Sequence, residues 1–197
     1  MKKYTSTAVS YAFWFSELSS ILDLLANGLN FDDIKYKAFD ENYFQLTATK
    51  RTEKMYHEVI RRVKSLSESM QQLFPLLDSD NQRLVNLIAI MNTTPLVETF
   101  MTTVFRDEIV LGDYLIEPRE FNGFFMNLQA SHSEVASWTD QTIKRLERVI
   151  KNFLREARLV ETDGDNLKIK RSLLDPRLED LLRKGNKTNY VQALVGR

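Results

Sequence analysis

The chain has 197 residues, and its 27 lysines and arginines balance 27 aspartates and glutamates, so its formal net charge is zero. A surface for nucleic acid must therefore come from a local cluster of cations, because the whole molecule has no field that attracts phosphate. The absence of cysteine excludes disulfides, a thiolate nucleophile and a cysteine-bound zinc, and it fits a reducing cytoplasm.

The sequence shows no sign of export or membrane insertion. Its first residues lack the pattern of a signal peptide. The most apolar window, Leu84 to Met91, is much shorter than the ~20 residues that a bilayer crossing needs. We therefore expect a cytoplasmic protein with no membrane partner.

The N-terminal region, residues 1–112, is expected to be helical because the chain contains few prolines and glycines. Residues 2–11 are polar and are expected to be loose. Apolar residues at helical spacing predict helices over 16–25, 32–39, 49–66, 68–77, 79–91 and 95–110. Ser79 suits an N-cap, and Pro95 suits a first helical turn.

The next region, residues 113–171, follows the order of a winged helix-turn-helix. A helix beginning at Pro118 and a short second helix lead into a tight turn, where Thr139 suits the N-cap of a long helix over 140–158. Asp163-Gly164 lies between two runs in which apolar and polar residues alternate. This pattern predicts a hairpin over 159–171, because a tight hairpin turn needs a residue that accepts positive φ. Residues 172–197 are predicted to form a helical tail.

The long helix is predicted to carry cations along one side. Apolar residues define its buried face: Ile143, Leu146, Val149, Ile150, Phe153, Leu154 and Ala157. Five cations follow positions i, i+4, i+7, i+11 and i+14 on another face: Lys144, Arg148, Lys151, Arg155 and Arg158. In the hairpin, Lys168 and Lys170 alternate with apolar residues and so share one face. Together, helix and hairpin suit a phosphate backbone, although a solvated charged face is the alternative.

The predicted helix over 49–66 repeats this spacing. Its polar face carries Lys50, Lys54, His57, Arg61 and Lys64. A solvent face laced with salt bridges is the simpler interpretation for this helix taken alone. The two cationic helices could form one surface or face opposite directions, so we treat this second face as a secondary DNA contact.

Motifs for catalysis or metal binding are incomplete in this sequence. His132 and Glu134 match part of a nucleobase deaminase motif, but the cysteine ligands are absent. Loop residues 163–166 resemble part of a calcium loop without its closing glutamate. Neither a Gly-rich phosphate loop nor a Gly-x-Ser-x-Gly turn occurs. We expect no enzymatic activity, no cofactor and no metal.

Several stretches match a known pattern in their order and spacing. They are Ser16-Glu17, Ala26 to Leu29, Glu41 to Leu46, Arg61 to Leu66, Leu111 to Asp113, Phe121 to Phe125, Trp138 to Leu146, Phe153 to Ala157 and Leu174 to Leu178. Over nearly its whole length the chain resembles the BrxA family of bacterial BREX phage-defence systems, once catalogued as inner-membrane proteins. The resemblance implies a small, mainly helical, non-enzymatic protein that is similar to the NusB antitermination factor and binds double-stranded DNA.

The predicted fold is therefore mainly α, a helical bundle with a C-terminal winged helix-turn-helix-like segment that carries one β-hairpin. The predicted function is binding of double-stranded DNA, largely without sequence preference, because the cationic surface is rich in Lys and Arg and poor in Asn and Gln. Other BREX proteins are expected partners. Two alternatives stay open: an adaptor that assembles other defence subunits, and an RNA-binding factor.

Overall fold

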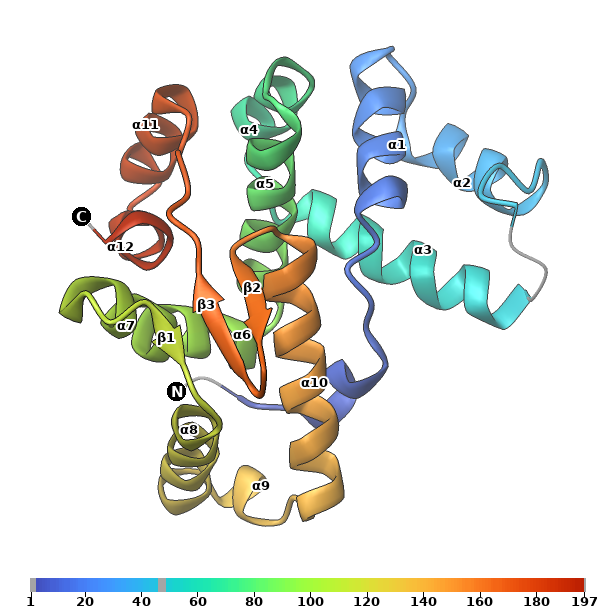
Figure 1. The fold of residues 1–197 in the computed structure, drawn as a ribbon. Helices are drawn as coiled ribbons and strands as arrows, with labels where there is room; N and C mark the ends of the chain where they lie inside the picture. Colours follow the sequence, from blue (N-terminus) through green and yellow to red (C-terminus); the bar gives the residue numbers. More distant parts are fainter. Residues whose placement is uncertain (1–2, 46–48, 197) are drawn as a thin grey trace.

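The computed structural model of the chain describes residues 3–45 and 49–196. Within these ranges the protein is mainly helical and carries one small antiparallel sheet, as the sequence predicted (Figure 1). Its buried apolar residues form one cluster that runs through all three predicted regions. The division at residues 112 and 171 stays a prediction, and Lys2 and Arg197 lie outside the described residues.

The N-terminal region closely follows the predicted helices. Its elements are η1 (Ser6–Ser10), α1 (Phe15–Ala26), α2 (Phe31–Phe39), α3 (Thr49–Lys64), α4 (Glu68–Leu73), η2 (Phe74–Leu76) and α5 (Ser79–Thr93). The single helix predicted over 68–77 is wrong, because α4 gives way to the short 3-10 helix η2 at Pro75. Proline has no N–H to continue α-helical bonding, so the chain tightens there.

Helix α5 lies at the centre of the molecule, and all of its residues from Leu84 to Met91 are buried. The predicted cap at Ser79 is wrong by one residue. Asp78 is the N-cap, and its carboxylate accepts hydrogen bonds from the backbone N–H groups of Asp80 and Asn81 at 3.0 and 2.8 Å. The bonds from Asn81 hold the pKa of Asp78 below its ordinary value.

The N-terminal segment is ordered against the core, which contradicts the loose conformation predicted for residues 2–11. Tyr4 and Ala8 are buried, and η1 packs against α10 (Asp140–Glu156). The Tyr4 hydroxyl is 3.0 Å from the hydroxyl of Thr99. The prediction relied on the polar composition of the segment, but burial of Tyr4 and Ala8 is enough to hold so short a segment against the core.

One long helical run follows Pro95. It consists of α6 (Pro95–Phe100), a π-helical turn η3 (Met101–Phe105) and α7 (Arg106–Leu111), and it ends at Gly112, whose φ is +80°. Among the described residues no single helix is long and apolar enough to span a membrane; α5 and this run meet that test only as a pair bent by 112°.

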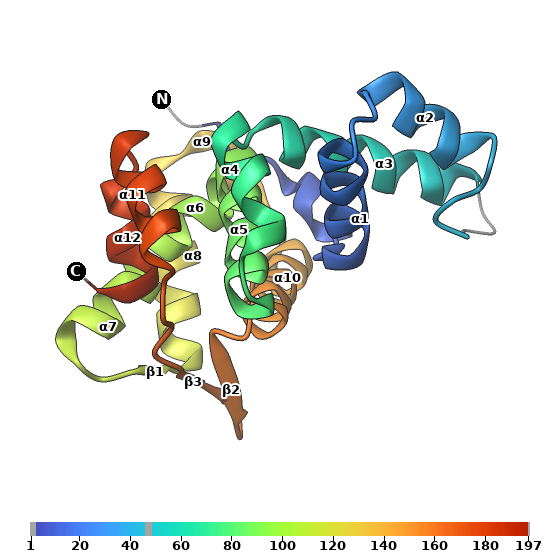
Figure 2. The ribbon, with the colours of Figure 1, turned by 90° about the horizontal axis from the view of Figure 1, so that it is seen from above.

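The remaining elements include the three strands of the sheet. They are β1 (Leu115–Ile116), α8 (Pro118–Ser131), α9 (Ser133–Ala136), α10 (Asp140–Glu156), β2 (Val160–Asp163), β3 (Asn166–Ile169), α11 (Pro176–Lys184) and α12 (Thr188–Val195). The predicted hairpin is confirmed as β2 and β3, and it projects from the helices (Figure 2). Strand β1 was not predicted; it pairs antiparallel with β3, giving the order β1-β3-β2. Helix α12 packs against η3 and α7.

Candidate nucleic-acid interface

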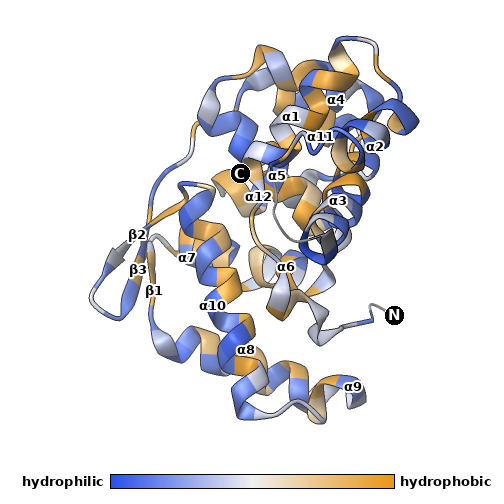
Figure 3. Cartoon of the chain, turned by 90° about the vertical axis from the view of Figure 1, so that its right-hand side faces the viewer, coloured by the Kyte–Doolittle hydropathy of each residue, from blue (hydrophilic) through white to orange (hydrophobic). Residues whose placement is uncertain are grey.

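Helix α10 is the long helix that the sequence predicted, and its start is confirmed. The Thr139 hydroxyl accepts a hydrogen bond from the backbone N–H of Thr142 at 3.2 Å. Leu146, Ile150 and Phe153 are buried, so one side of the helix faces the core while the other faces solvent (Figure 3).

The predicted end of this helix at Arg158 is wrong, because α10 stops at Glu156. Arg158 has φ +59°, and the N–H of Leu159 bonds to the carbonyl of Leu154 at 3.0 Å. This left-handed residue closes the helix C-terminus and turns the chain into β2. Glycine usually takes such a position, so an arginine there does not by itself indicate where the helix ends.

Three of the four exposed cations of α10 lie on its N-terminal half. Lys144, Arg145 and Arg148 are exposed and have no ion-pair partner among the residues that the structure describes. With Asp140 and Gln141 they line a surface hollow of about 340 Å³. The prediction missed Arg145. Its position could have been inferred from helical spacing, because positions i, i+3, i+4 and i+7 share one face and are occupied here by Gln141, Lys144, Arg145 and Arg148.

The C-terminal half of the predicted cationic face is largely occupied by contacts within the protein. Lys151 is 17% exposed; its Nζ is 2.6 Å from Glu147 Oε1 and lies 4.7 Å from the centre of the Phe121 ring. Arg155 is exposed and donates a hydrogen bond from Nε to the Thr162 hydroxyl at 3.0 Å. Arg155 therefore ties α10 to β2 while keeping its charge unpaired.

Strand β3 contributes one free cation. Lys168 is exposed and has no ion-pair partner within the described ranges. Lys170 follows β3 and pairs with Glu161 at 2.8 Å, which lowers the pKa of the Glu161 carboxyl. Its charge is thus offset locally by the neighbouring strand.

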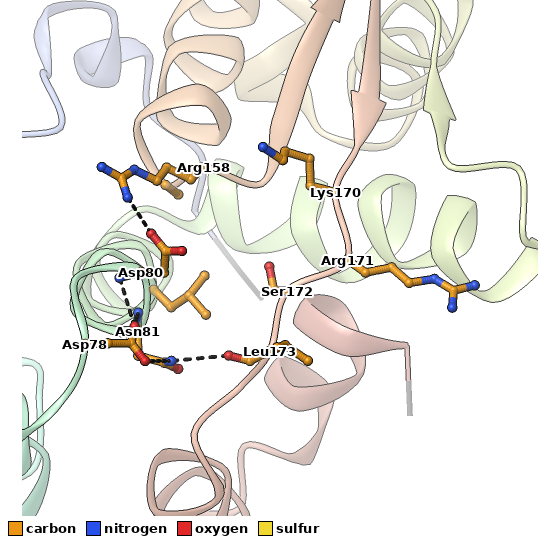
Figure 4. A pocket seen from close by; sticks show the side chains of 10 residues that line it. Asp78, Asp80, Asn81, Arg158, Lys170, Arg171, Ser172 and Leu173 are labelled. Carbon is orange, nitrogen blue, oxygen red and sulfur yellow. Dashed lines mark hydrogen bonds and ion pairs between the residues drawn. The ribbon is translucent and has the colours of Figure 1, made fainter.

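A hollow of about 550 Å³ lies between the start of α5, the end of α10 and the segment that follows β3. Figure 4 shows Arg158 reaching across it to Asp80, with an N–O distance of 2.7 Å. Lys170 lines the same hollow, whereas the Arg171 side chain points away from it toward Tyr114. Arg158 acts here as a link between α10 and α5, and its charge is already paired.

The cations of α3 show a similar division. Lys50 and Lys54 are exposed and unpaired within the described chain, and His57 is exposed. Arg61 donates to Glu58 at 2.8 Å and to the carbonyl of Thr93 at 2.8 Å. Lys64 is exposed, with its Nζ 4.7 Å from the centre of the Phe31 ring. The unpaired charges of this face therefore lie at both ends of α3, at Lys50 and Lys54 and, over an aromatic ring, at Lys64.

The two cationic helices do not join directly. Segment 3–14 passes between α3 and α10 (Figure 1), with η1 packed on α10. On its other side, Ser6, Thr7 and Ser10 line a hollow of about 680 Å³ together with Lys54 and His57. A polar strip of η1 therefore separates the two cationic faces.

Arg62 is a buried arginine, which its neighbours in the sequence do not predict. Its side chain is fully buried, pairs with Glu58 at 3.2 Å and donates to the backbone carbonyls of Phe13 and Ala12 at 2.8 and 3.0 Å. Burial lowers the pKa of Arg62 to about 10, against the opposing effect of Glu58, so it stays charged at neutral pH. It joins α3 to the N-terminal segment and is not available to a ligand.

Known proteins share this sequence and fold. A profile of the BrxA family matches residues 2–186. The BREX protein BrxA of Bacillus cereus (strain H3081.97) is 31% identical over 193 residues, covering 98% of this chain and 96% of that protein. The chain belongs to the BrxA family. As a BrxA-family member it belongs to a phage-defence system.

A solved structure supports the fold of this BrxA-family protein. The crystal structure of an uncharacterized protein from Magnetospirillum magneticum superposes with a TM-score of 0.76 and covers 100% of both chains. Its sequence identity is 16%, so the likeness concerns the fold alone.

Proposed function

We propose that this BrxA-family protein is a non-enzymatic, cytoplasmic component of its BREX system that binds double-stranded DNA. The proposed DNA-binding unit is a winged helix-turn-helix made of β1, α8, α9, α10 and the β2–β3 hairpin. The antiparallel strand order β1-β3-β2 and the position of the hairpin directly after α10 support it. Helix α10 corresponds to the helix that enters the major groove in such units.

One observation carries the proposal: Lys144, Arg145 and Arg148 are exposed and unpaired at the N-terminal half of α10. In helix-turn-helix proteins the N-terminal part of the recognition helix approaches the DNA most closely. A cation without an acidic partner can neutralise a phosphate without first breaking an ion pair. The free charge is thus concentrated at the position that this binding mode requires.

The same surface favours binding without strong sequence preference. Its free groups are mostly lysines and arginines, whose contacts with phosphate fix position and carry no sequence information. Lys168 on the hairpin would meet the backbone beside the helix, and Lys50 and Lys54 at the start of α3 are secondary contacts. Membership in a BREX system makes other BREX proteins plausible partners as well.

A double charge reversal tests this placement. Lys144→Glu with Arg148→Glu should abolish the retardation of duplex DNA in a gel at low salt, because repulsion replaces two phosphate contacts. The matched control is Lys35→Glu with Lys184→Glu, which changes the net charge equally at exposed positions of α2 and α11. Circular dichroism should show unchanged helicity in both.

Three results would count against the proposal. Unchanged DNA affinity in the α10 variant would exclude this surface, and equal losses in both variants would reduce the effect to net charge. Structured RNA that displaces duplex DNA at a lower concentration than duplex competitor would favour the RNA-binding alternative.

A further inference from the structure

A second surface feature lies on the far side of α8 from α10. Phe121 of α8 faces Lys151 of α10, whereas Gly123, Phe124 and Asn127 of the same helix line a groove against the Pro95–Leu111 run. The groove has a volume of about 510 Å³. Both views of the ribbon place α7 and α8 on the side of the molecule opposite α3 (Figures 1 and 2).

The groove has an apolar part among polar side chains, and some of that apolar part has no packing partner. Val104, Leu111, Phe124 and Leu128 line it, and Leu111 is 79% exposed. In helix α7, Ile109 packs against the core, whereas Val110 and Leu111 are 62% and 79% exposed. A Cβ placed on Gly123 would meet no atom within 4 Å, so the groove is open at that point. Exposed apolar surface of this kind marks sites of protein association.

The rim of the groove is acidic. Asp107, Glu108 and Glu120 line it, and none of the described lining residues is a lysine or arginine. Glu108 has no ion-pair partner in the described part of the chain, while Asp107 and Glu120 pair with Arg106 and Arg119.

Burial and the nearby charge of Glu120, followed by that of Asp113, raise the pKa of Glu108. A cation placed at the rim would relieve this repulsion.

We propose that this groove docks a cationic amphipathic helix of a partner protein. Apolar side chains of the helix enter beside Leu111, and one of its lysines or arginines reaches Glu108. DNA is a poor occupant because the rim repels phosphate. A second copy of this chain is also a poor occupant, because its described cationic helices, α3 and α10, bury their apolar faces in their own core.

The probe is a fluorescein-labelled peptide of about 16 residues, with leucines at helical spacing on one face and lysines on its flanks. A peptide of the same composition in scrambled order is the reference, since it keeps the charge and loses the apolar face. Fluorescence anisotropy with the full chain measures both affinities. The amphipathic peptide should bind about tenfold tighter than the scrambled one.

Two leucine substitutions on α8 test the site itself. Gly123→Leu should fill the groove without disturbing the helix, because the position is open and helical, and should weaken the amphipathic peptide about tenfold. Asn122→Leu is the matched control, one residue away, exposed and outside the groove, and it should bind like the wild type. Glu108→Gln should weaken binding as well, whereas Asp23→Asn on α1 should not.

Equal affinity of the two peptides, or equal affinity of the Gly123→Leu and Asn122→Leu variants, would overturn the proposal. Self-association of the wild type that Gly123→Leu abolishes would also overturn it, in favour of a second copy. The DNA-binding proposal fails or holds separately: Gly123→Leu should keep its affinity for duplex DNA, and the Lys144→Glu, Arg148→Glu variant should keep its affinity for the peptide.

Discussion

The ion pairs around α10 determine how strongly DNA binding through this helix and the hairpin should depend on salt. Besides Arg171, whose guanidinium lies over the Tyr114 ring, eight cations lie on α10, at its end and on the hairpin. Of these eight, Lys151, Arg158 and Lys170 already pair with carboxylates. Five have no acidic partner among the described residues: Lys144, Arg145, Arg148, Arg155 and Lys168. Each phosphate neutralised contributes about −0.9 to the slope of log K against log salt, so five give about −4.5.

This slope corresponds to a loss of affinity of about 500-fold when salt rises from about 50 to about 200 mM. Arg148→Gln should reduce the slope by about 0.9, because it removes one free cation. Lys170→Gln should change the slope little, since Glu161 already offsets that charge. The pair of variants therefore separates free from paired cations on one surface.

Fluorescence anisotropy with a labelled duplex of about 20 base pairs, about two helical turns, measures affinity across the salt series. A wild-type slope near −7, which all eight cations would give, would show that the ion pairs open on binding. Equal slope changes for Arg148→Gln and Lys170→Gln would refute the distinction between free and paired charge. A slope near zero would exclude phosphate contacts altogether.

Two further predictions concern stability. Arg62→Met should lower the free energy of unfolding in urea by about 3 kcal/mol, because it leaves the buried Glu58 carboxylate with Arg61 as its remaining partner and removes the guanidinium donor of the Ala12 carbonyl. Arg61→Met, at a side chain 45% exposed, should lower it by less than about 1 kcal/mol. Similar midpoints for the two variants would contradict the assigned roles. The side chain of Arg177 lowers the pKa of Asp175 from 3.8 to about 2, so this carboxylate should stabilise the fold above the higher value and lose its effect as pH falls through the lower one. Asp175→Asn should therefore reduce the pH dependence of the thermal unfolding midpoint between these two values. A pH dependence equal to that of the wild type would argue against the ion pair.

Local chemistry was enough to predict the helices, the hairpin and many of their caps and turns. Thr139 begins α10 because its hydroxyl bonds to a backbone group three residues away, and Gly164 turns the hairpin with φ +60°. Apolar spacing identified Leu146, Ile150 and Phe153 as buried. Such signals act within one or two helical turns, so they can be read from the residues alone.

The state of each charge depends on contacts with distant parts of the chain. Arg158 meets an aspartate 78 positions away, and Arg62 is buried against carbonyls about 50 positions away. Periodicity places such side chains on a helix face, but it says nothing about what packs against that face. Strand β1 escaped prediction for the same reason, because two residues become a strand only when β3 supplies their hydrogen bonds. Which cations are free for a phosphate is thus a property of the packed chain, since ion pairing requires atoms to approach within about 4 Å whatever their separation in sequence.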